Sequence, residues 1–125
     1  MEYRPLGNSG LKVSLIGLGT NVFGPHGTLG NYTDQKGAET ILHRAADLGI
    51  NLIDTADMYA DGVSETYIGK AIAGRRDDFI IASKVGFQMG DGPNNEGLSR
   101  AHIMTSIEGS LRRLDTDYVD LYYAH

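Results

Sequence analysis

The stretches Leu52-Ile53-Asp54-Thr55-Ala56 and Phe79-Ile80-Ile81-Ala82 decide the fold class, because both are short and apolar and a helical pattern lies between them. The second stretch is apolar without alternation, which is typical of a strand covered on both faces. Between them, Ser64 is a candidate helix N-cap and Gly74 a stop signal. The apolar residues of this helix recur at helical spacing, at Tyr67, Ile68, Ala71 and Ile72. A strand–helix–strand unit of this kind predicts an α/β fold with a parallel sheet.

The same alternation extends toward both ends of the chain. Leu15–Gly19 is a strand candidate, and the helix that follows it would begin after Thr33 as N-cap and end at Gly49. Ser99 would cap a third helix, and Tyr118–His125 would form the last strand. The apolar positions at helical spacing are Ala38, Ile41, Leu42, Ala45 and Leu48 in the first helix, and Ile103, Ile107, Leu111 and Leu114 in the third. Residues 15–125 are therefore predicted to contain four parallel strands and three helices.

Residues 2–15 predict a hairpin ahead of this unit. Glu2–Leu6 and Leu11–Leu15 are short extended candidates, and Gly7-Asn8-Ser9-Gly10 between them supplies the positive-φ positions of a tight turn. Pro5 cannot donate to a ladder and restricts its strand to an edge. Because no linker or low-complexity tract interrupts residues 1–125, we predict one domain.

Composition narrows the class of protein. The 125 residues are 41% hydrophobic and 22% charged, as in ordinary globular domains. The net charge of −5 argues against nucleic acid and anionic membranes as main partners. The chain has no cysteine, no apolar run of about 20 residues and no signal-peptide pattern at its start, so a cytoplasmic location is expected.

Candidate functional residues follow three of the predicted strands. In parallel α/β folds, function collects at the C-terminal ends of the strands. Asp54, Lys84 and His125 stand at such ends, and Tyr59 lies in the loop behind Asp54. Each of the four also has a structural interpretation when it is taken singly. The aspartate could form a turn, the lysine could extend to solvent, the tyrosine could pack in its loop, and the terminal histidine could have no role. Because period-two alternation can direct all three strand-end side chains to one face, their recurrence favours a shared site.

These residues also stand in a familiar sequence context. Gly49–Ala56 is followed by Tyr59 and then by Ser64-Glu65, Ile80–Val85 contains the lysine, and Leu111–Tyr122 leads to His125. Together with the opening hairpin, they resemble the aldo-keto reductase family over essentially the whole chain. The resemblance implies a (β/α)8 TIM barrel, of which this chain would supply the hairpin and the first four strands with three helices. The Gly- and Pro-rich segment Gly90–Gly97, which would lie over the site, resembles bacterial and plant members related to potassium-channel β subunits.

The resemblance implies NADPH-dependent reduction of aldehydes or ketones to alcohols. The implied tetrad is Asp54, Tyr59, Lys84 and His125. Hydride transfer leaves an alkoxide that needs a proton, and Tyr59 would donate it. The ammonium of Lys84 would favour the phenolate that remains, Asp54 would hold Lys84, and His125 would orient the carbonyl oxygen.

Further residues are assigned from the same resemblance. The nicotinamide half of NADP(H) would approach the end of the first strand and the ribose would lie near the tetrad; the residues concerned are Gly19, Thr20, Asn21 and Asp54. A small carbonyl substrate would contact Phe23, Tyr59, Phe87 and His125. For Phe23 and Phe87, simple loop packing is the alternative.

The sequence also allows other interpretations. Gly17-Leu18-Gly19 does not continue as a dinucleotide-binding fingerprint, because Val22 stands where Gly or Ala is required. Asp54, Asp57, His102 and His125 fit no metal-site spacing, and His102 is expected to be exposed in the first turn of a helix, so no metal is predicted. A cofactor-binding regulatory subunit of the channel-β type stays open, as does a non-catalytic half-barrel.

The last predicted strand is followed by no crossover helix, which indicates part of a longer barrel. In the resembled family, the loops that grip the cofactor's pyrophosphate and 2′-phosphate come mainly from later strands, so NADPH rather than NADH is implied by the resemblance alone. The 125-residue chain by itself is expected to self-associate through open strand edges and to be inactive.

Overall fold

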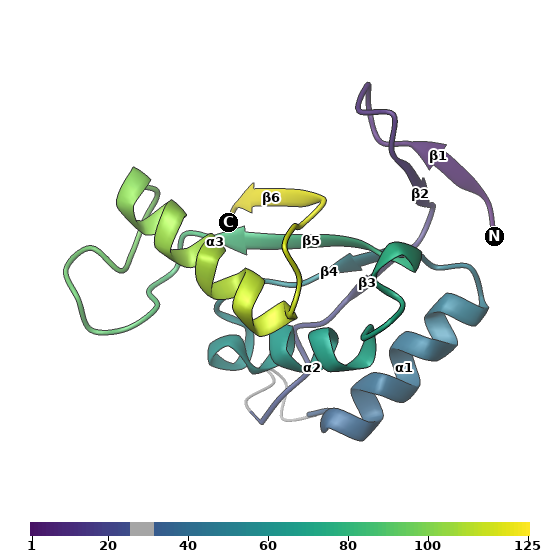
Figure 1. Ribbon diagram of the computed structural model, residues 1–125, viewed down its shortest axis with the longest axis horizontal. Helices are drawn as coiled ribbons and strands as arrows, with labels where there is room; N and C mark the ends of the chain where they lie inside the picture. The colour runs from purple at the N-terminus through teal and green to yellow at the C-terminus, as the bar shows by residue number, and fades with distance from the viewer. Residues whose placement is uncertain (26–31) are drawn as a thin grey trace.

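A computed structural model describes residues 1–25 and 32–125 of the chain. Strands and helices alternate along it, as the sequence predicts (Figure 1). The elements are β1 (Tyr3–Pro5), β2 (Lys12–Ser14), β3 (Gly17–Gly19), α1 (Gln35–Asp47), β4 (Leu52–Asp54), the 3-10 helix η1 (Tyr59–Gly62), α2 (Val63–Ala71), the 3-10 helix η2 (Arg76–Asp78), β5 (Ile80–Val85), α3 (Arg100–Leu114) and β6 (Leu121–Ala124).

The central element is a four-stranded parallel sheet in the order β3-β4-β5-β6. Leu52 of β4 pairs with Gly17 on one side and Ile80 on the other. Helices α1, α2 and α3 lie next to one another along the sheet (Figure 1). This is the order that successive β–α–β units produce. The predicted count of four strands and three α-helices after the hairpin is confirmed for the described residues.

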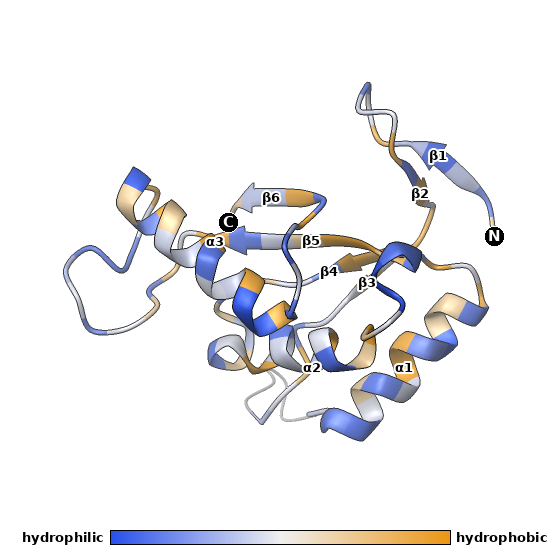
Figure 2. Ribbon diagram, in the orientation of Figure 1, coloured by the Kyte–Doolittle hydropathy of each residue, from blue (hydrophilic) through white to orange (hydrophobic). Residues whose placement is uncertain are grey.

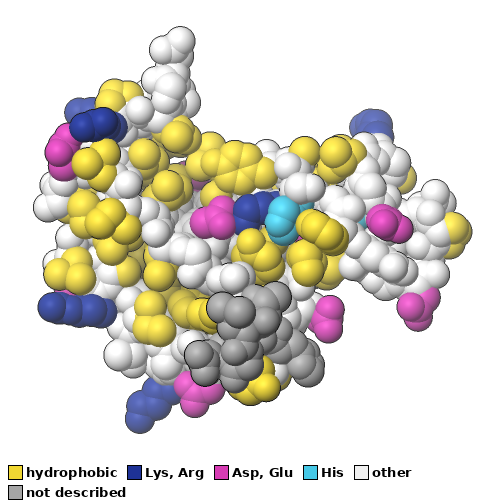
Figure 3. All heavy atoms as spheres, turned by 180° about the vertical axis from the view of Figure 1, so that it is seen from behind, with side chains coloured by type: hydrophobic (Ala, Val, Ile, Leu, Met, Phe, Trp, Pro, Cys, Tyr) yellow, Lys and Arg dark blue, Asp and Glu magenta, His cyan; other side chains and the backbone are white. Residues whose placement is uncertain are grey.

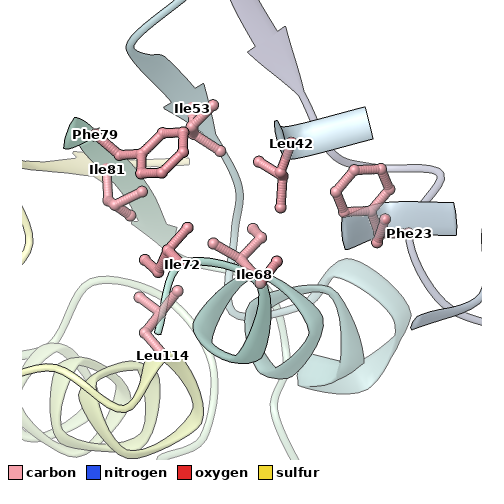
Figure 4. Packing of buried hydrophobic residues seen from close by; sticks show 10 residues of the cluster. Phe23, Leu42, Ile53, Ile68, Ile72, Phe79, Ile81 and Leu114 are labelled. Carbon is pink, nitrogen blue, oxygen red and sulfur yellow. The ribbon is translucent and has the colours of Figure 1, made fainter. Parts of the chain in front are cut away.

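The hydrophobic core lies between this sheet and the three helices. Figure 4 shows its side chains converging from the strands and the helices, and Figure 2 shows hydrophobic residues along β4 and most of β5. Its buried members are Phe23, Ala38, Leu42, Ile53, Ile68, Ala71, Ile72, Phe79, Ile81 and Leu114. Because Ile53 and Ile81 face the helices, the alternate side chains of β4 and β5 point to the opposite face of the sheet. That face carries the candidate site.

Two of the three predicted helix caps are wrong. The N-cap of α1 is Asp34, whose side chain accepts a hydrogen bond from the Gly37 amide, so the helix begins one residue later than predicted from Thr33. Helix α2 is entered through Gly62 in the left-handed region, and Ser64 lies inside the helix. Ser99 does cap α3, accepting from the His102 amide.

The predicted hairpin forms as a separate antiparallel ribbon of β1 and β2 (Figure 1). Gly7 and Gly10 in its turn have φ of 53° and 82°, as a tight turn requires. The Tyr3 hydroxyl donates to the Gly49 carbonyl at 2.9 Å, and Asn51 donates to the Lys12 carbonyl at 3.0 Å. These bonds fix the ribbon to the turn that leads into β4. No helix among the described residues is long and apolar enough to cross a membrane.

Candidate active site

Lys84 is the centre of the site, and all the hydrogen-bond donors of its ammonium group have acceptors. Its Nζ donates to Asp54 Oδ2 at 2.8 Å, to the Thr55 carbonyl at 2.8 Å and to the Tyr59 hydroxyl at 3.1 Å. An ammonium has three hydrogens, and these bonds account for all of them. The two strand-end residues meet because β4 and β5 are adjacent and parallel, so the sequence prediction that Asp54 and Lys84 share a face is confirmed.

Electrostatics at this centre favour a charged lysine. The Lys84 side chain is 13% exposed, and burial by itself would lower its pKa. The hydrogen bonds to Asp54 and Tyr59 outweigh burial and raise the pKa of Lys84 above its ordinary value of 10.5. The ammonium is therefore protonated across the physiological range. A fixed positive charge lies beside the phenol oxygen.

Tyr59 reaches this charge from a tight turn. Its hydroxyl accepts a hydrogen bond from Lys84, which leaves its own hydrogen free to be donated elsewhere. The Lys84 Nζ also lies 4.7 Å from the centre of the Tyr59 ring. Beyond Tyr59, Ala60 and Asp61 adopt φ of 50° and 54°, in the left-handed region that non-glycine residues rarely enter. Such strain is typical of functional turns held by their surroundings.

His125 and Phe87 complete the site. The His125 amide donates to the Val85 carbonyl at 2.8 Å, which aligns the end of β6 with the end of β5. Its ring packs edge-on against Tyr59 at 5.9 Å and against Phe87 at 4.7 Å between ring centres. A cavity of about 360 Å³ opens here, lined by Asn21, Met58, Tyr59, Ala60, Asp61, Phe87 and His125. Figure 3, seen from behind the view of Figure 1, shows acidic, basic and histidine side chains adjacent among apolar ones.

The structure corrects two of the predicted contacts. Phe23 is 1% exposed and belongs to the core, so its assignment as a pocket wall is wrong. Thr20 is fully buried and donates its hydroxyl to the Asp54 carbonyl at 3.0 Å, so its side chain is closed to a cofactor. Gly19 and Asn21 are exposed, and Asn21 lines the cavity. Phe87 is 50% exposed at the cavity, as a pocket wall requires.

Two further expectations also fail. The segment 90–97 lines no part of the cavity; Asn95 instead lies near His102 and Ser106. His102 is 3% exposed rather than solvated, and its Nδ1 lies 2.8 Å from the Gly97 carbonyl oxygen. Across residues 1–25 and 32–125, His, Asp and Glu side chains nowhere gather in groups of three that could hold a metal.

A buried polar layer behind the site was missed from the sequence. Glu65 is fully buried, where it accepts from the Ser83 hydroxyl at 2.6 Å and from Arg113 Nε at 2.7 Å. Asp57 is also fully buried and accepts from the Ser106 hydroxyl. The sequence does contain a signal for this layer: some positions that strand and helix periodicity assign to the buried face are polar. Ser83, which follows Ala82 in a predicted buried strand, is an example.

Comparisons with known proteins agree with this geometry. Residues 15–125 match the aldo/keto reductase family. The chain is 46% identical over 128 residues to "Probable voltage-gated potassium channel subunit beta" of Arabidopsis thaliana, and 42% identical over 127 residues to aldo-keto reductase YhdN of Bacillus subtilis. All of this chain is covered in both cases, and it spans 37% and 38% of those proteins.

A solved structure shows the same likeness. The aldo-keto reductase AKR11C1 from Bacillus halodurans superposes with a TM-score of 0.83 at 43% identity, over 98% of this chain and 39% of that chain. The chain therefore belongs to the aldo/keto reductase family. Its sheet and helices have the fold of one part of a (β/α)8 barrel.

Proposed function

We propose that the protein carrying this chain reduces aldehydes or ketones to alcohols with NADPH. One observation carries the proposal: a single ammonium group, Lys84 Nζ, holds both the Asp54 carboxylate and the Tyr59 hydroxyl within 3.1 Å. A structural lysine at a strand end would point to solvent. Here the charge is instead directed at a phenol that borders a cavity.

Each member of the group has a defined task in such a reaction. When hydride reaches the carbonyl carbon, the electron pair of the C=O bond moves to oxygen, and the phenol of Tyr59 gives its proton to that oxygen. The phenolate that remains is stabilised by the Lys84 ammonium, 3.1 Å away. Asp54 keeps this ammonium charged and aimed, and His125 can donate a hydrogen bond to the carbonyl oxygen. The product alcohol then leaves, and Tyr59 regains a proton from water.

NADP(H) supplies the hydride in this proposal, and the residues present are compatible with it. Gly19 pairs with Asp54 in the sheet, and a side chain added at Gly19 would meet nothing within 4 Å. A bare strand end beside the tetrad suits an extended cofactor, and Gly19, Asn21 and Asp54 would hold its nicotinamide half. The choice of NADPH over NADH rests on the resemblance to the family.

The remaining assignments follow from the same proposal. The partner is a small carbonyl compound, with no role for nucleic acid or membrane, and the location is cytoplasmic. The net charge of −5 and the absence of cysteine support this.

Tyr59→Phe tests the function most directly, because phenylalanine keeps the ring and removes only the donor. We expect turnover of a reactive aldehyde to fall by roughly 10²- to 10⁴-fold while NADPH affinity is unchanged. Tyr67→Phe, in helix α2 away from the cavity, is the matched control and should keep full turnover. Retention of more than about a tenth of wild-type turnover by Tyr59→Phe would contradict the assignment.

A second candidate is a cofactor-binding regulatory subunit. Its support is the 46% identity to "Probable voltage-gated potassium channel subunit beta". A regulatory subunit should bind NADPH and turn over no aldehyde, whereas a reductase should bind NADPH and reduce the aldehyde. The complete Asp54–Lys84–Tyr59 arrangement favours the enzyme.

A further inference from the structure

The turn that carries Tyr59 needs external support. Ala60, Asp61 and Gly62 have consecutive φ values of 50°, 54° and 87°, so two residues with side chains stand in the disfavoured left-handed region. A backbone of this kind persists only when its neighbours hold it. On one flank, a Cβ added to Gly24 would lie 2.5 Å from the Cβ of Ala60, so the turn is packed tightly there.

Asp57 holds the other flank. It lies two residues before Tyr59 and is fully buried. Its amide donates to the carbonyl of Lys84 at 3.3 Å, and its carboxylate accepts a hydrogen bond from the hydroxyl of Ser106 on α3. Asp57 is thereby connected to the lysine strand through its backbone and to an outer helix through its side chain.

Among the described residues, Ser106 supplies the side-chain hydrogen bond that this carboxylate accepts. The other oxygen of this carboxylate, Oδ1, is buried and accepts from no group among the described residues. Burial raises the pKa of the nearby Tyr122, a hydrogen bond with Ser106 opposes this shift, and the charges of Asp57 and Glu65 add to it. Removing the Ser106 hydroxyl would leave this buried carboxylate without its side-chain donor, at a cost in free energy that a shift of the turn can reduce.

We propose that Asp57 and Ser106 are positioning residues for Tyr59: their hydrogen bond anchors the strained turn to α3 and sets the contact between the phenol and Lys84. The proposal rests on the function proposed above. Neither residue lines the cavity at Tyr59, so both act through the turn and not on the substrate. A displacement of about 1 Å at a reacting group can lower a rate by as much as 100-fold.

Ser106→Ala is the direct test, with Ser110→Ala as its matched control. Both serines are buried on α3 one turn apart, but only Ser106 contacts Asp57. We expect Ser106→Ala to lower kcat roughly 10- to 100-fold with KM little changed, and Ser106→Thr, which keeps the hydroxyl, to restore most of it. Ser110→Ala should keep wild-type kcat. Equal losses in both alanine variants would overturn the proposal.

The Tyr59→Phe background separates positioning from general damage to the fold. If Ser106 acts through the phenol, Ser106→Ala should lower the residual kcat of Tyr59→Phe no further. A second full loss in that background would show that the serine acts elsewhere, and would overturn the proposal.

A readout that needs no turnover keeps this result distinct from the proposed function. The hydrogen bond to Tyr59 helps to raise the pKa of Lys84, so the lysine ¹³Cε resonance, assigned with Lys84→Met, should titrate at lower pH in Ser106→Ala and not in Ser110→Ala. An unchanged Lys84 titration in Ser106→Ala refutes the positioning role. If the wild-type protein lacks turnover but Ser106→Ala still shifts the Lys84 titration, the reductase proposal alone is refuted.

Discussion

Arg113→Met should lower the free energy of unfolding by about 3 kcal/mol, because it leaves the carboxylate of Glu65 buried without a counter-charge. The Glu65 side chain is 0% exposed and that of Arg113 is 26% exposed, with Nε and Oε2 2.7 Å apart. Removing one partner of a buried pair costs about 3–5 kcal/mol, and the partial exposure of Arg113 places this pair at the lower end. Methionine keeps much of the apolar stem that lies against Gly62, so the loss reports mainly on charge.

The assay is urea denaturation followed by circular dichroism, with the slope of the transition compared between variants. Arg4→Met is the control, since Arg4 and Glu2 form an ion pair with side chains 67% and 63% exposed. Breaking an exposed pair changes stability by about 0–1 kcal/mol. The double variant Glu65→Leu with Arg113→Met should recover part of the loss, because no buried charge is left. If Arg113→Met is no worse than Arg4→Met, or if the double variant is worse than Arg113→Met, the reasoning is refuted.

Three other expectations can be checked independently. Because the folded state raises the pKa of Lys84, its contacts with Asp54 and Tyr59 stabilise the protein fully below pH 10.5 and lose their effect as the pH rises through the folded pKa. The melting temperatures of wild type and Lys84→Met should therefore differ by a constant amount from pH 7 to 9. Above pH 10.5, the melting temperature of wild type should fall relative to that of Lys84→Met. Gly69→Ala normally favours a helix by about 1 kcal/mol, but here it should lower the melting temperature, since the added Cβ would lie 2.6 Å from the Leu114 carbonyl on α3; a raised melting temperature would contradict this packing. The 125-residue chain alone should associate through the edges of β3 and β6, and sedimentation as a compact monomer would contradict this. It should also show no NADPH-dependent reduction, and steady reduction of an aldehyde would contradict that expectation.

The inner group of the site could be predicted because strand periodicity is a strong local rule. Once Leu52–Asp54 and Ile80–Val85 are recognised as adjacent parallel strands, alternation alone brings Asp54 and Lys84 to one face. Loop residues follow no such rule. The place of Phe23 after a strand predicts a pocket wall, but an aromatic side chain in a loop can point inward or outward with the same local sequence. Ala60 gives no sequence signal for its left-handed backbone, and Asp61, although aspartate enters this region more readily, does not by itself predict two such residues in a row.

The position of the buried polar layer follows from the alternation of side chains at the strand ends. Asp54 and Lys84 face the cavity side, and their chain neighbours Thr55 and Ser83 are fully buried on the helix side. There Thr55 Oγ1 lies 3.2 Å from the hydroxyl of Ser64, and Ser83 donates to Glu65. Polar residues therefore occupy both faces at the C-terminal ends of these strands, and buried polar groups require partners.

Helices α2 and α3 supply those partners from positions that an ordinary amphipathic helix would fill with apolar residues. Ser64 and Glu65 lie at the start of α2, and Ser106 lies on the buried side of α3. Leucine at Ser106 would satisfy the helical pattern and still leave Asp57 buried without a donor. A polar residue at a predicted core position of a helix that covers strand ends is thus evidence for a site on the far face of the sheet. In this chain, that criterion selects the strands that carry Asp54 and Lys84 without reference to either residue.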